Sequence, residues 1–423
     1  MKKIIESLPI GWTEKQLKDN NTFLRRGKSP VYSEDNQGLF VVNQDCIRWN
    51  CINLGKVKYH VVPNQIDESS YLCEGDILIN STGTGTIGRV NQWSYSDVQA
   101  VADSHVTVLR TMEDSIDSTY ARYFLTSELG QRYLESVCYT GSTNQIELSK
   151  RYFSKLELPC APLPEQKAIA GILSIVDESI KAKANSILSA ERLKKSFIQN
   201  LLTGKLKPDG VWRSEKEFYI DEKFGMVPRN WQIKKVSDIS FNYDSRRKPI
   251  KAENRKGIVG DFPYYGAAGI IDWVNSYIFD GDYILFGEDG NNLLSRKVPQ
   301  AFIVRGKFWA NNHAHVIQAN TKYITTEYLC EQLESKDYRS IIYGSAQPKI
   351  NKRDLNGIKI LVPDNISEQI SIMKIIGVVD EELNLLLAKR LKLNNLRKSL
   401  MQNLLTGKVR VDVDKINKLL DKA

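Results

Sequence analysis

The sequence predicts an α+β fold with two similar α/β domains separated by two long helices. The helices form a coiled coil, and the whole arrangement is a pseudo-twofold internal repeat. One observation behind this prediction is a duplicated segment, residues 164–205 and 368–408, in which Glu165 matches Glu368 and Gln199 matches Gln402, each 203 residues later. A second observation is that a block of similar length precedes each segment. A constant offset without insertions is typical of one rigid element that has been duplicated.

The spacing of apolar residues predicts that both segments are helical. These residues recur three and four positions apart, which places a single apolar stripe along a helix. A helix of about 40 residues at 1.5 Å per residue would be roughly 60 Å long. Because an apolar stripe needs a partner, we expect the two stripes to face each other. The stripe positions are Ile169, Leu173, Val176, Ile180, Ile187, Ala190, Leu193, Phe197 and Leu201, and then Ile372, Ile376, Val379, Leu383, Leu386, Leu393, Leu396, Leu400 and Leu404.

The repeat extends beyond the helices to the start of each block. Pro9 and Trp12 match Pro228 and Trp231, and each helical segment ends at Thr-Gly, where Gly204 and Gly407 suit a left-handed helix cap. These boundaries predict a first α/β domain, a central helical region, a second α/β domain, a C-terminal helical region and a tail, at residues 1–160, 161–207, 208–362, 363–410 and 411–423.

Within each block, short β-rich runs alternate with polar loops. Gly75-Asp76 and Gly281-Asp282 predict a turn before a buried strand, and residues 119–137 and 325–341 predict a helix in each copy. A basic turn follows the start of each block, and a loop with amides and a Lys-Arg pair precedes each helical region. The two copies share this framework but differ in the side chains of the loops.

Composition limits the classes of function. The 423 residues carry a formal charge of +9, with 42% hydrophobic and 26% charged residues, as expected for a folded protein with an anionic partner. No apolar run is long enough to span a membrane, and the start of the chain lacks the apolar core of a signal peptide. Six scattered cysteines without a CxxC pair favour a reducing cytoplasm.

Several motifs of catalysis or nucleotide binding are excluded. Residues 83–88 fit GxGxxG, but the residues that follow have no helical period, so no helix N-terminus would receive a pyrophosphate. His313 and His315 resemble a metal-binding pair, yet no repeated carboxylate or cysteine completes a metal site, and a structural or base-reading histidine fits better. No GxSxG, HExxH, complete phosphate loop or Asn/Asp-Pro-Pro-Tyr/Phe run is present.

Two related frames with different polar loops on a basic chain indicate two DNA-reading domains. Arginine, asparagine, glutamine, serine and threonine side chains read base edges, while basic side chains also hold phosphates. For each loop, the alternative is an ordinary solvated surface. The candidate DNA-contacting residues are Arg25, Arg26, Lys28, Thr82, Thr84, Thr86, Arg89, Ser104, His105, Asn144, Gln145, Lys150, Arg151, Arg246, Arg247, Lys248, Asp289, Asn291, Asn292, Asn312, His313, Gln347, Lys349, Lys352 and Arg353.

The layout resembles the specificity (S) subunit of type I restriction–modification enzymes. The resemblance rests on the Pro-Trp starts, residues 262–281, the ANNHAHV run at 310–316, the loop at 141–159, the PLPEQ helix start and both QNLLTGK ends. It implies that each block is a target recognition domain and that the two long helices pack antiparallel. It further implies a non-catalytic subunit that binds a bipartite, asymmetric double-stranded DNA target and holds two methyltransferase (M) subunits and the restriction (R) subunits. S-adenosylmethionine, ATP and magnesium would belong to those partners, and this chain would hold no cofactor or metal.

Two other classes fit parts of the sequence. A stand-alone DNA-binding regulator would use the same two readers but would not need paired long helices. A purely structural coiled-coil scaffold would not need basic, amide-rich loops. A methyltransferase gene beside this one would separate the three.

Overall fold

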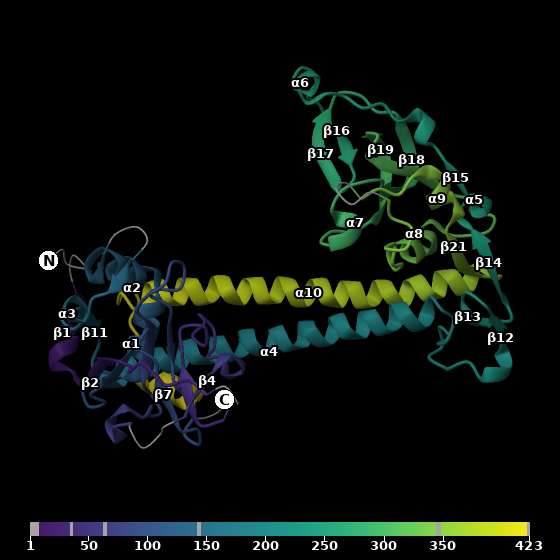
Figure 1. The fold of residues 1–423 in the computed structure, drawn as a ribbon. Helices are drawn as coiled ribbons and strands as arrows, with labels where there is room; N and C mark the ends of the chain where they lie inside the picture. The colour runs from purple at the N-terminus through teal and green to yellow at the C-terminus, as the bar shows by residue number, and fades with distance from the viewer. Residues whose placement is uncertain (1–7, 34–36, 62–65, 142–144, 344–347, 421–423) are drawn as a thin grey trace. The chain divides into compact units, whose positions relative to one another are not determined.

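A computed structural model describes residues 8–33, 37–61, 66–141, 145–343 and 348–420 (Figure 1). The chain divides into two compact units. The first contains the chain up to Ala184 together with the residues from Ala388 onward, and the second runs from Asn185 to Leu387. Each unit therefore holds one α/β domain, the half of one long helix that leaves that domain, and the final half of the other long helix.

Two helices of equal length confirm the predicted repeat. Helix α4 spans Leu163–Leu201 and helix α10 spans Ile366–Leu404; each has 39 residues, and α10 begins and ends 203 residues after α4. In the first unit the start of α4 packs against the end of α10, so the helices are antiparallel. Arg397 Nε lies 2.5 Å from Asp177 Oδ1 there, and in the second unit Lys194 Nζ lies 2.7 Å from Asp380 Oδ1.

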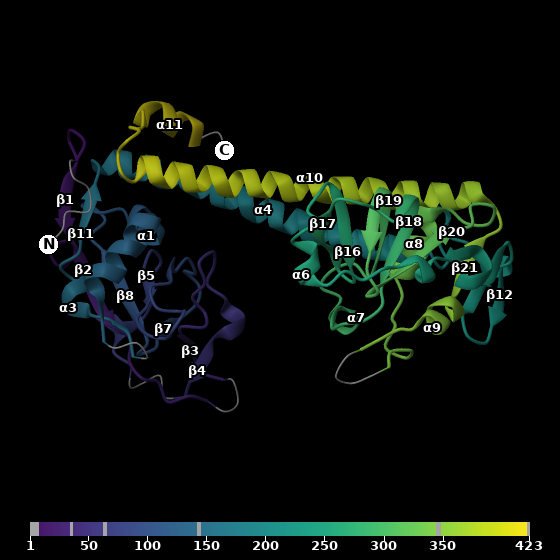
Figure 2. The same ribbon diagram turned by 90° about the horizontal axis from the view of Figure 1, so that it is seen from above.

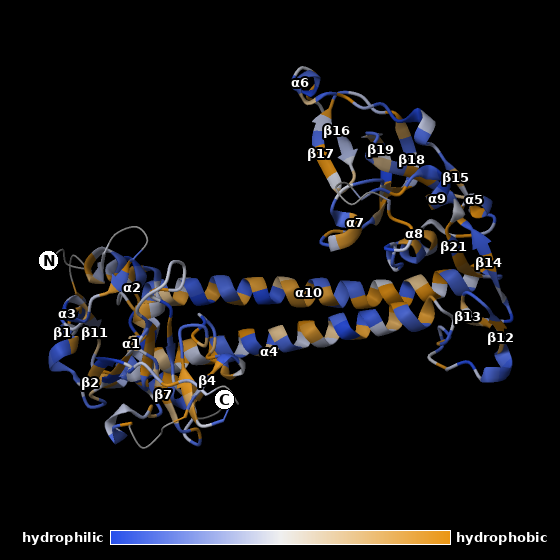
Figure 3. Cartoon of the chain, viewed as in Figure 1, coloured by the Kyte–Doolittle hydropathy of each residue, from blue (hydrophilic) through white to orange (hydrophobic). Residues whose placement is uncertain are grey.

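The apolar stripes are buried only in part. Ile169 and Leu173 share a core cluster with Leu404 in the first unit, and Ile372 shares one with Leu201 in the second. The expectation that the whole stripes face each other was wrong at Leu193 and Leu396, which are 49% and 47% exposed. These two positions are equivalent in the repeat, so the same position is exposed in both helices. Apolar and polar residues alternate along both helices in Figure 3.

The first domain contains a four-stranded sheet, a three-stranded sheet and two strand pairs, with strand orders β2-β8-β5-β6, β4-β3-β7, β1-β11 and β10-β9. Its elements are β1 (Thr13–Gln16), β2 (Asn21–Arg26), β3 (Leu39–Val42), β4 (Lys58–His60), β5 (Ile77–Asn80), β6 (Val90–Gln92), β7 (Ala100–Ala102), β8 (Val106–Thr111), α1 (Ser118–Thr126), α2 (Glu128–Tyr133), β9 (Tyr139–Thr140), β10 (Glu147–Leu148), α3 (Lys150–Phe153) and β11 (Glu157–Cys160).

The second domain has a six-stranded sheet, β15-β20-β18-β19-β16-β17, with the pairs β14-β21 and β12-β13 beside it. Its elements are β12 (Phe218–Asp221), β13 (Gly225–Pro228), β14 (Trp231–Lys235), α5 (Val236–Ile239), β15 (Ser240–Asn242), α6 (Ala252–Arg255), β16 (Phe262–Gly266), β17 (Gly269–Val274), β18 (Phe279–Gly287), α7 (Asn292–Ser295), β19 (Ala301–Ala310), β20 (Ala314–Ala319), α8 (Thr326–Glu334), α9 (Lys352–Gly357) and β21 (Lys359–Pro363).

The two domains share a central strand pair. Strand β5 pairs with β8 and strand β18 pairs with β20, both antiparallel, and the registers place Ile79 opposite Thr107 and Phe286 opposite His315. Helices α1 and α8 follow these strands, each started by a side-chain cap, from Asp117 and Thr325 respectively. The frame predicted from the repeat is therefore present in both units.

Three local predictions differ from the structure. Gly281-Asp282 is no turn, because β18 runs straight through Gly281 at φ +127. The helix expected at 119–137 is broken at Ser127, whose side chain caps α2, and α8 already ends at Glu334. Arg25 and Arg26 lie in strand β2 rather than in a turn.

At the start of each domain, a proline and a tryptophan pack against the glycine that ends one of the long helices. Gly407 adopts the predicted left-handed conformation at φ +67, so close to Pro9 that an added Cβ would lie 2.3 Å from the proline ring. Gly204, at φ +70, meets Pro228 in the same way, and a Cβ there would lie 2.4 Å from the ring. Any side chain at either glycine would push the helix end away from its domain.

A carboxylate strengthens each of these junctions, and in the first unit that carboxylate is buried. Glu165, in the first turn of α4, accepts hydrogen bonds of 2.8 and 2.7 Å from the Arg410 guanidinium. Burial opposes ionisation, but these bonds and the positive charge hold the pKa of Glu165 below its ordinary value. In the second unit, Arg213 binds Glu368 of α10 in the equivalent way.

The tail carries one more helix, α11 (Val413–Leu420), which is labelled in Figure 2 and contacts α4 at Gly171. Leu420 packs over Gly171, where an added Cβ would meet its side chain. Among the described residues, no helix is both long and apolar enough to cross a membrane.

We predict that Gly407→Ala lowers the free energy of unfolding of the first unit by about 2 kcal/mol or more, since a left-handed alanine costs roughly 1–2 kcal/mol before any clash. Gly210→Ala is the matched control, because Gly210 also has positive φ (+85) but no neighbour within 4 Å of a Cβ. Gly377→Ala, inside α10 with open space around it, should stabilise by roughly 0.5–1 kcal/mol. Urea denaturation followed by circular dichroism measures all three. Equal losses for Gly407→Ala and Gly210→Ala would rule out the proposed contact with Pro9.

Candidate nucleic-acid interface

Three separate loops meet at one edge of the first domain. The loop after β5 pairs with the segment before α3 through a bridge between Thr82 and Glu147. The turn before β8 joins the same loop, because the Ser81 N–H donates to the carbonyl of His105 at 2.8 Å. Thr82 and Gln145, with neighbouring residues, line a groove here that also includes Gly83, Thr84, Thr140, Gly141, Ile146 and Glu147.

The same three loops meet in the second domain. Asp289 bridges to Lys349, and the Glu288 N–H donates to the carbonyl of His313 at 2.8 Å. Ser81 and Glu288 therefore occupy equivalent positions, and so do Thr82 and Asp289. The backbone framework of the edge is repeated, while its side chains change from hydroxyls to carboxylates.

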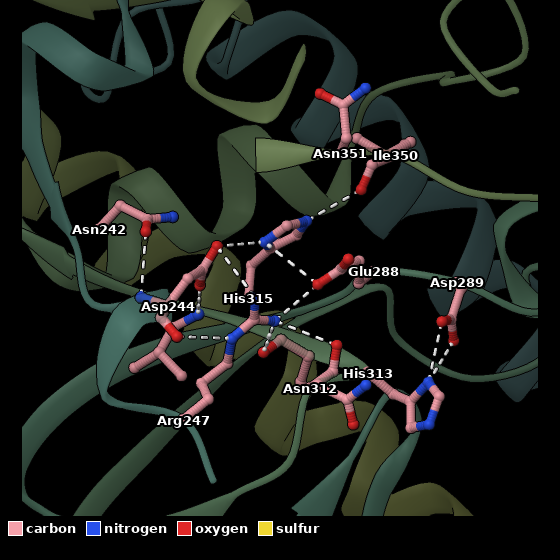
Figure 4. A network of polar contacts seen from close by, with 12 residues as sticks. Asn242, Asp244, Arg247, Glu288, Asp289, Asn312, His313, His315, Ile350 and Asn351 are labelled. Atoms are coloured by element: carbon pink, nitrogen blue, oxygen red, sulfur yellow. Dashed lines mark hydrogen bonds and ion pairs between the residues drawn. The ribbon is translucent and has the colours of Figure 1, made fainter. Parts of the chain in front are cut away.

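In the second domain, the buried side chain of His315 links the loop edge to Asp244, which follows strand β15 (Figure 4). His315 Nδ1 lies 2.6 Å from Asp244 Oδ2, and Nε2 lies 2.9 Å from the carbonyl oxygen of Ile350. Both neighbours accept hydrogen bonds only, so both contacts are made when both ring nitrogens carry a proton. The ring lies between the carboxylates of Asp244 and Glu288, and its Nδ1 is 3.7 Å from Glu288 Oε2.

Arg247 and Lys349 complete this network. Arg247 Nη1 donates to Glu288 at 2.6 Å and to the carbonyl of Ala314 at 2.9 Å, and Lys349 Nζ lies 2.8 Å from Glu288. In the first domain the equivalent interior is neutral: Thr107 stands where His315 does, and its hydroxyl lies 2.6 Å from that of Ser81.

These contacts shift the pKa values of the acids and of Lys349. Burial opposes ionisation of Asp244, yet its hydrogen bond and attraction to His315 hold the pKa below the ordinary value. The pKa of Glu288 is lowered as well, because hydrogen bonds from Lys349 and Arg247 outweigh its burial. The Glu288 carboxylate raises the pKa of Lys349. Both carboxylates are therefore ionised at neutral pH, and their contacts with Arg247, Lys349 and His315 hold the loops of this edge in one arrangement.

Most candidate residues lie at or near these two edges. They differ in whether the side chain is hydrogen-bonded within the protein or exposed. Several of them are hydrogen-bonded within the protein: Arg26 to Glu147 and the Leu148 carbonyl, Arg89 to the Gly85 carbonyl, Asn292 to Val298 and Gln300, and Arg247 as described. Arg25 bonds to Ser69, and Arg246 to the carbonyl of Ile278. Lys28, Thr84, His105, Gln145, Lys248, Asn291, Asn312, His313 and Lys349 are exposed, whereas Thr82, Thr86, Ser104 and Asp289 are half-buried.

The two Lys-Arg pairs open short helices at equivalent places. Lys150 and Arg151 begin α3, Lys352 and Arg353 begin α9, and all four side chains are exposed. Basic side chains at such positions are free to reach an external phosphate. The candidates Asn144 and Gln347 lie outside the described residues.

One segment of the first domain escaped the sequence analysis. Residues 43–57, between β3 and β4, pack against the candidate loop: Asn80 donates to the Gln44 carbonyl at 3.0 Å, and the Thr86 hydroxyl lies 3.5 Å from Gln44 Oε1. Trp49 in this segment is 46% exposed. In the second domain the corresponding strands β16 and β17 are joined directly by Ala267 and Ala268, so the insertion has no counterpart there. Without a matching stretch in the other copy, the repeat gave no signal for it.

The HAH run does not act as a pair. His313 bonds to Asp289 at the surface while His315 is buried against Asp244, so the two rings serve different groups (Figure 4). Within the described part of the chain, no cluster of three or more histidine, cysteine, aspartate or glutamate residues could hold a metal ion.

Comparisons with known proteins agree over both units. A model of the type I restriction modification DNA specificity domain matches residues 9–191 and 228–395. A Methanocaldococcus jannaschii chain, named as specificity subunit of the type I restriction enzyme MjaX, is 24% identical over 415 residues, 96% of each chain. The MjaVIII specificity subunit of that organism is 25% identical over 370 residues, 80% of each chain. The crystal structure of a type I restriction-modification S subunit from M. genitalium has a TM-score of 0.59 at 17% identity, covering 95% of this chain and 97% of that one.

We predict that Glu288→Gln destabilises the second unit by about 1–3 kcal/mol at pH 7, because Arg247 and Lys349 lose a buried ionised partner. A lowered folded-state pKa means that the unfolded state binds more protons, so the stabilisation is complete above the unfolded value of about 4.3 and is lost as the pH falls through the folded value. The difference between wild type and variant should therefore shrink below about pH 4. Urea denaturation between pH 3 and 7 checks this. Glu147→Gln, whose side chain is 50% exposed, is the control with a small effect. A difference that stays constant with pH would contradict the ionised network.

Proposed function

Because the chain belongs to the family of type I restriction–modification DNA specificity domains, as the match over both units shows, we propose that each unit reads one half of a bipartite, asymmetric DNA target. The chain is the DNA specificity subunit of such a system and is non-catalytic. The observation that carries the two-half proposal is the loop edge, which repeats in backbone but not in side chains. Two domains with the same backbone arrangement would bind DNA in the same orientation. Their different loop side chains would select different base pairs.

The chemistry of each edge supports different half-sites. The first edge offers threonine hydroxyls and the exposed amide of Gln145, groups that both donate and accept. The second offers the Asp289 carboxyl group, His313 and the exposed amides of Asn291 and Asn312. Lys150 with Arg151, and Lys352 with Arg353, would hold the phosphate backbone beside each edge and fix its register.

Exposed apolar residues on the long helices support the binding of two identical partners. In the first unit, Ile175 and Leu396 each lie within two residues of the ion pair of Asp177 with Arg397, and both are more than a third exposed. In the second unit, Leu193 and Val378 each lie within two residues of the pair of Lys194 with Asp380, and both are likewise more than a third exposed.

The two apolar surfaces are equivalent, since each residue in one has its counterpart 203 positions away in the other. Apolar side chains on an otherwise polar helix surface are typical of a docking site. We assign one methyltransferase subunit to each surface. These partners would supply S-adenosylmethionine and the chemistry of base methylation, and the restriction subunits would supply ATP- and magnesium-dependent cleavage.

A domain exchange tests the two-reader proposal. Replacing residues 1–160 with the first domain of another family member should change one half of the methylated sequence and leave the other half unchanged, because the second edge keeps all its side chains. Methylome sequencing of a host that expresses the chimera with its methyltransferase subunit measures both halves. Exchange of residues 208–362 is the reciprocal control. A change in both halves, or in neither, would contradict one reader per unit.

We further predict that Leu193→Lys and Leu396→Lys each remove one of two bound methyltransferase subunits. Loss of the leucine contact, together with a charge placed in an apolar interface, weakens the binding free energy by about 2 kcal/mol or more, roughly a 30-fold loss of affinity. Lysine is nearly as good a helix former as leucine, so the helices should persist. Native mass spectrometry of the mixed subunits gives the stoichiometry.

The controls for this prediction are the double variant and a change at a polar site. The double variant should bind no methyltransferase subunit, and Asn185→Lys, at an exposed position that is already polar, should retain two. Two bound subunits in both single variants would place the docking sites elsewhere.

A further inference from the structure

His105 and His313 occupy the same position in the two units. Each lies in the turn before the second central strand, and its backbone N–H donates to the side chain two residues earlier, Asp103 at 2.6 Å or Asn311 at 2.8 Å. Each carbonyl accepts the 2.8 Å hydrogen bond from the loop after the first central strand. The turn is therefore held from both sides, and the imidazole is presented in the same way by both domains.

A different neighbour holds each ring at the same nitrogen. Nδ1 of His313 lies 2.8 Å from Asp289 Oδ2, and Nδ1 of His105 lies 2.9 Å from the Thr82 hydroxyl. For Nε2 of either ring, no partner is present among the residues that the structure describes. Figure 4 shows Nε2 of His313 on the side of the ring away from Asp289. Each domain thus exposes one free ring nitrogen at its loop edge.

The neighbour decides what that free nitrogen offers. The Asp289 carboxylate only accepts, so it holds the proton on Nδ1, and in the neutral ring Nε2 is left as an acceptor. The Thr82 hydroxyl both donates and accepts, so His105 keeps both tautomers, and its Nε2 offers either a donor or an acceptor. In the major groove an acceptor matches the amino group of adenine or cytosine, whereas a donor matches guanine or the O4 of thymine.

Two other roles fit the geometry less well. A histidine that served only the fold would gain from burial, yet the His313 side chain is 47% exposed, and the ring that is buried in this network is that of His315. A phosphate contact would need a proton on Nε2, which Asp289 disfavours in the neutral ring by holding the proton on Nδ1.

We propose that His313 is a specificity-determining residue of the second half-site, with Nε2 accepting a hydrogen bond from the amino group of an adenine or cytosine. Asp289 is its positioning residue, because it fixes the tautomer without touching the base. His105 with Thr82 is the corresponding, more permissive reader of the first half-site. This inference rests on the proposed function, in which these edges contact DNA.

The experiment uses the complex of this chain with its methyltransferase subunits at pH 8. Its target is first identified by methylome sequencing, and every base pair of both half-sites is then substituted in turn. His313→Ala should reduce discrimination roughly tenfold at one position of the second half-site, where adenine or cytosine is preferred on one strand, and leave the first half-site unchanged. His105→Ala should act only on the first half-site, with a smaller loss of discrimination.

Asp289→Thr separates positioning from mere folding. It copies the Thr82 contact of the first domain, so His313 should stay in place while its tautomers mix and the same position accepts additional bases. The ¹⁵N chemical shifts of the His313 ring nitrogens in the free chain should show the proton on Nδ1 in wild type and on both nitrogens in the variant.

Two outcomes would overturn the proposal. In His313→Ala, a uniform loss of affinity for all sequences would make His313 a phosphate contact, and unchanged discrimination would make it a surface residue. Failure of the proposed function is a separate result, in which the wild-type complex itself shows no base preference in the second half-site.

Discussion

The rest of the structure depends on the contact between the end of one long helix and the start of each domain. In each unit a left-handed glycine lies against a proline, and a glutamate in the first turn of the other helix is held by an arginine that follows the glycine. The carboxylate is buried in the first unit, so removal of the arginine would leave an unpaired buried charge, which costs several kcal/mol. Each domain is thereby bound to both long helices, although it continues directly into only one of them.

A rigid frame allows the loop edges to diverge. The first domain fills the space beneath its edge with Ser81 and Thr107, and the second fills it with Glu288 and His315. Both solutions satisfy their hydrogen bonds, and the ionised one needs the further charges of Asp244 and Arg247. Because the strands beneath are in the same register, such exchanges change the side chains at the edge without moving the backbone that carries them.

Each long helix packs within the protein and also keeps apolar side chains exposed, which a simple coiled coil does not do. One face of each helix is buried against its partner and its domain, as Ile169 and Ile372 show, while Leu193 and Leu396 stay open on another face. A continuous seam would have buried all of these residues. The same position is exposed in both helices, as Leu193 in α4 and Leu396 in α10.

The sequence by itself determined the repeat, the two helices with their glycine caps, and the loops that contain most of the candidate site, because local periodicity and a constant offset are visible in one dimension. Only the tertiary structure decided which side chains in those loops are free. Arg247 and Lys349 look alike as basic residues near a turn, yet the first is enclosed by Asp244 and Glu288 and the second is exposed on one side. The insertion at 43–57 and the role of His315 were likewise hidden, since strand pairing brings them to the edge from residues far apart in the chain.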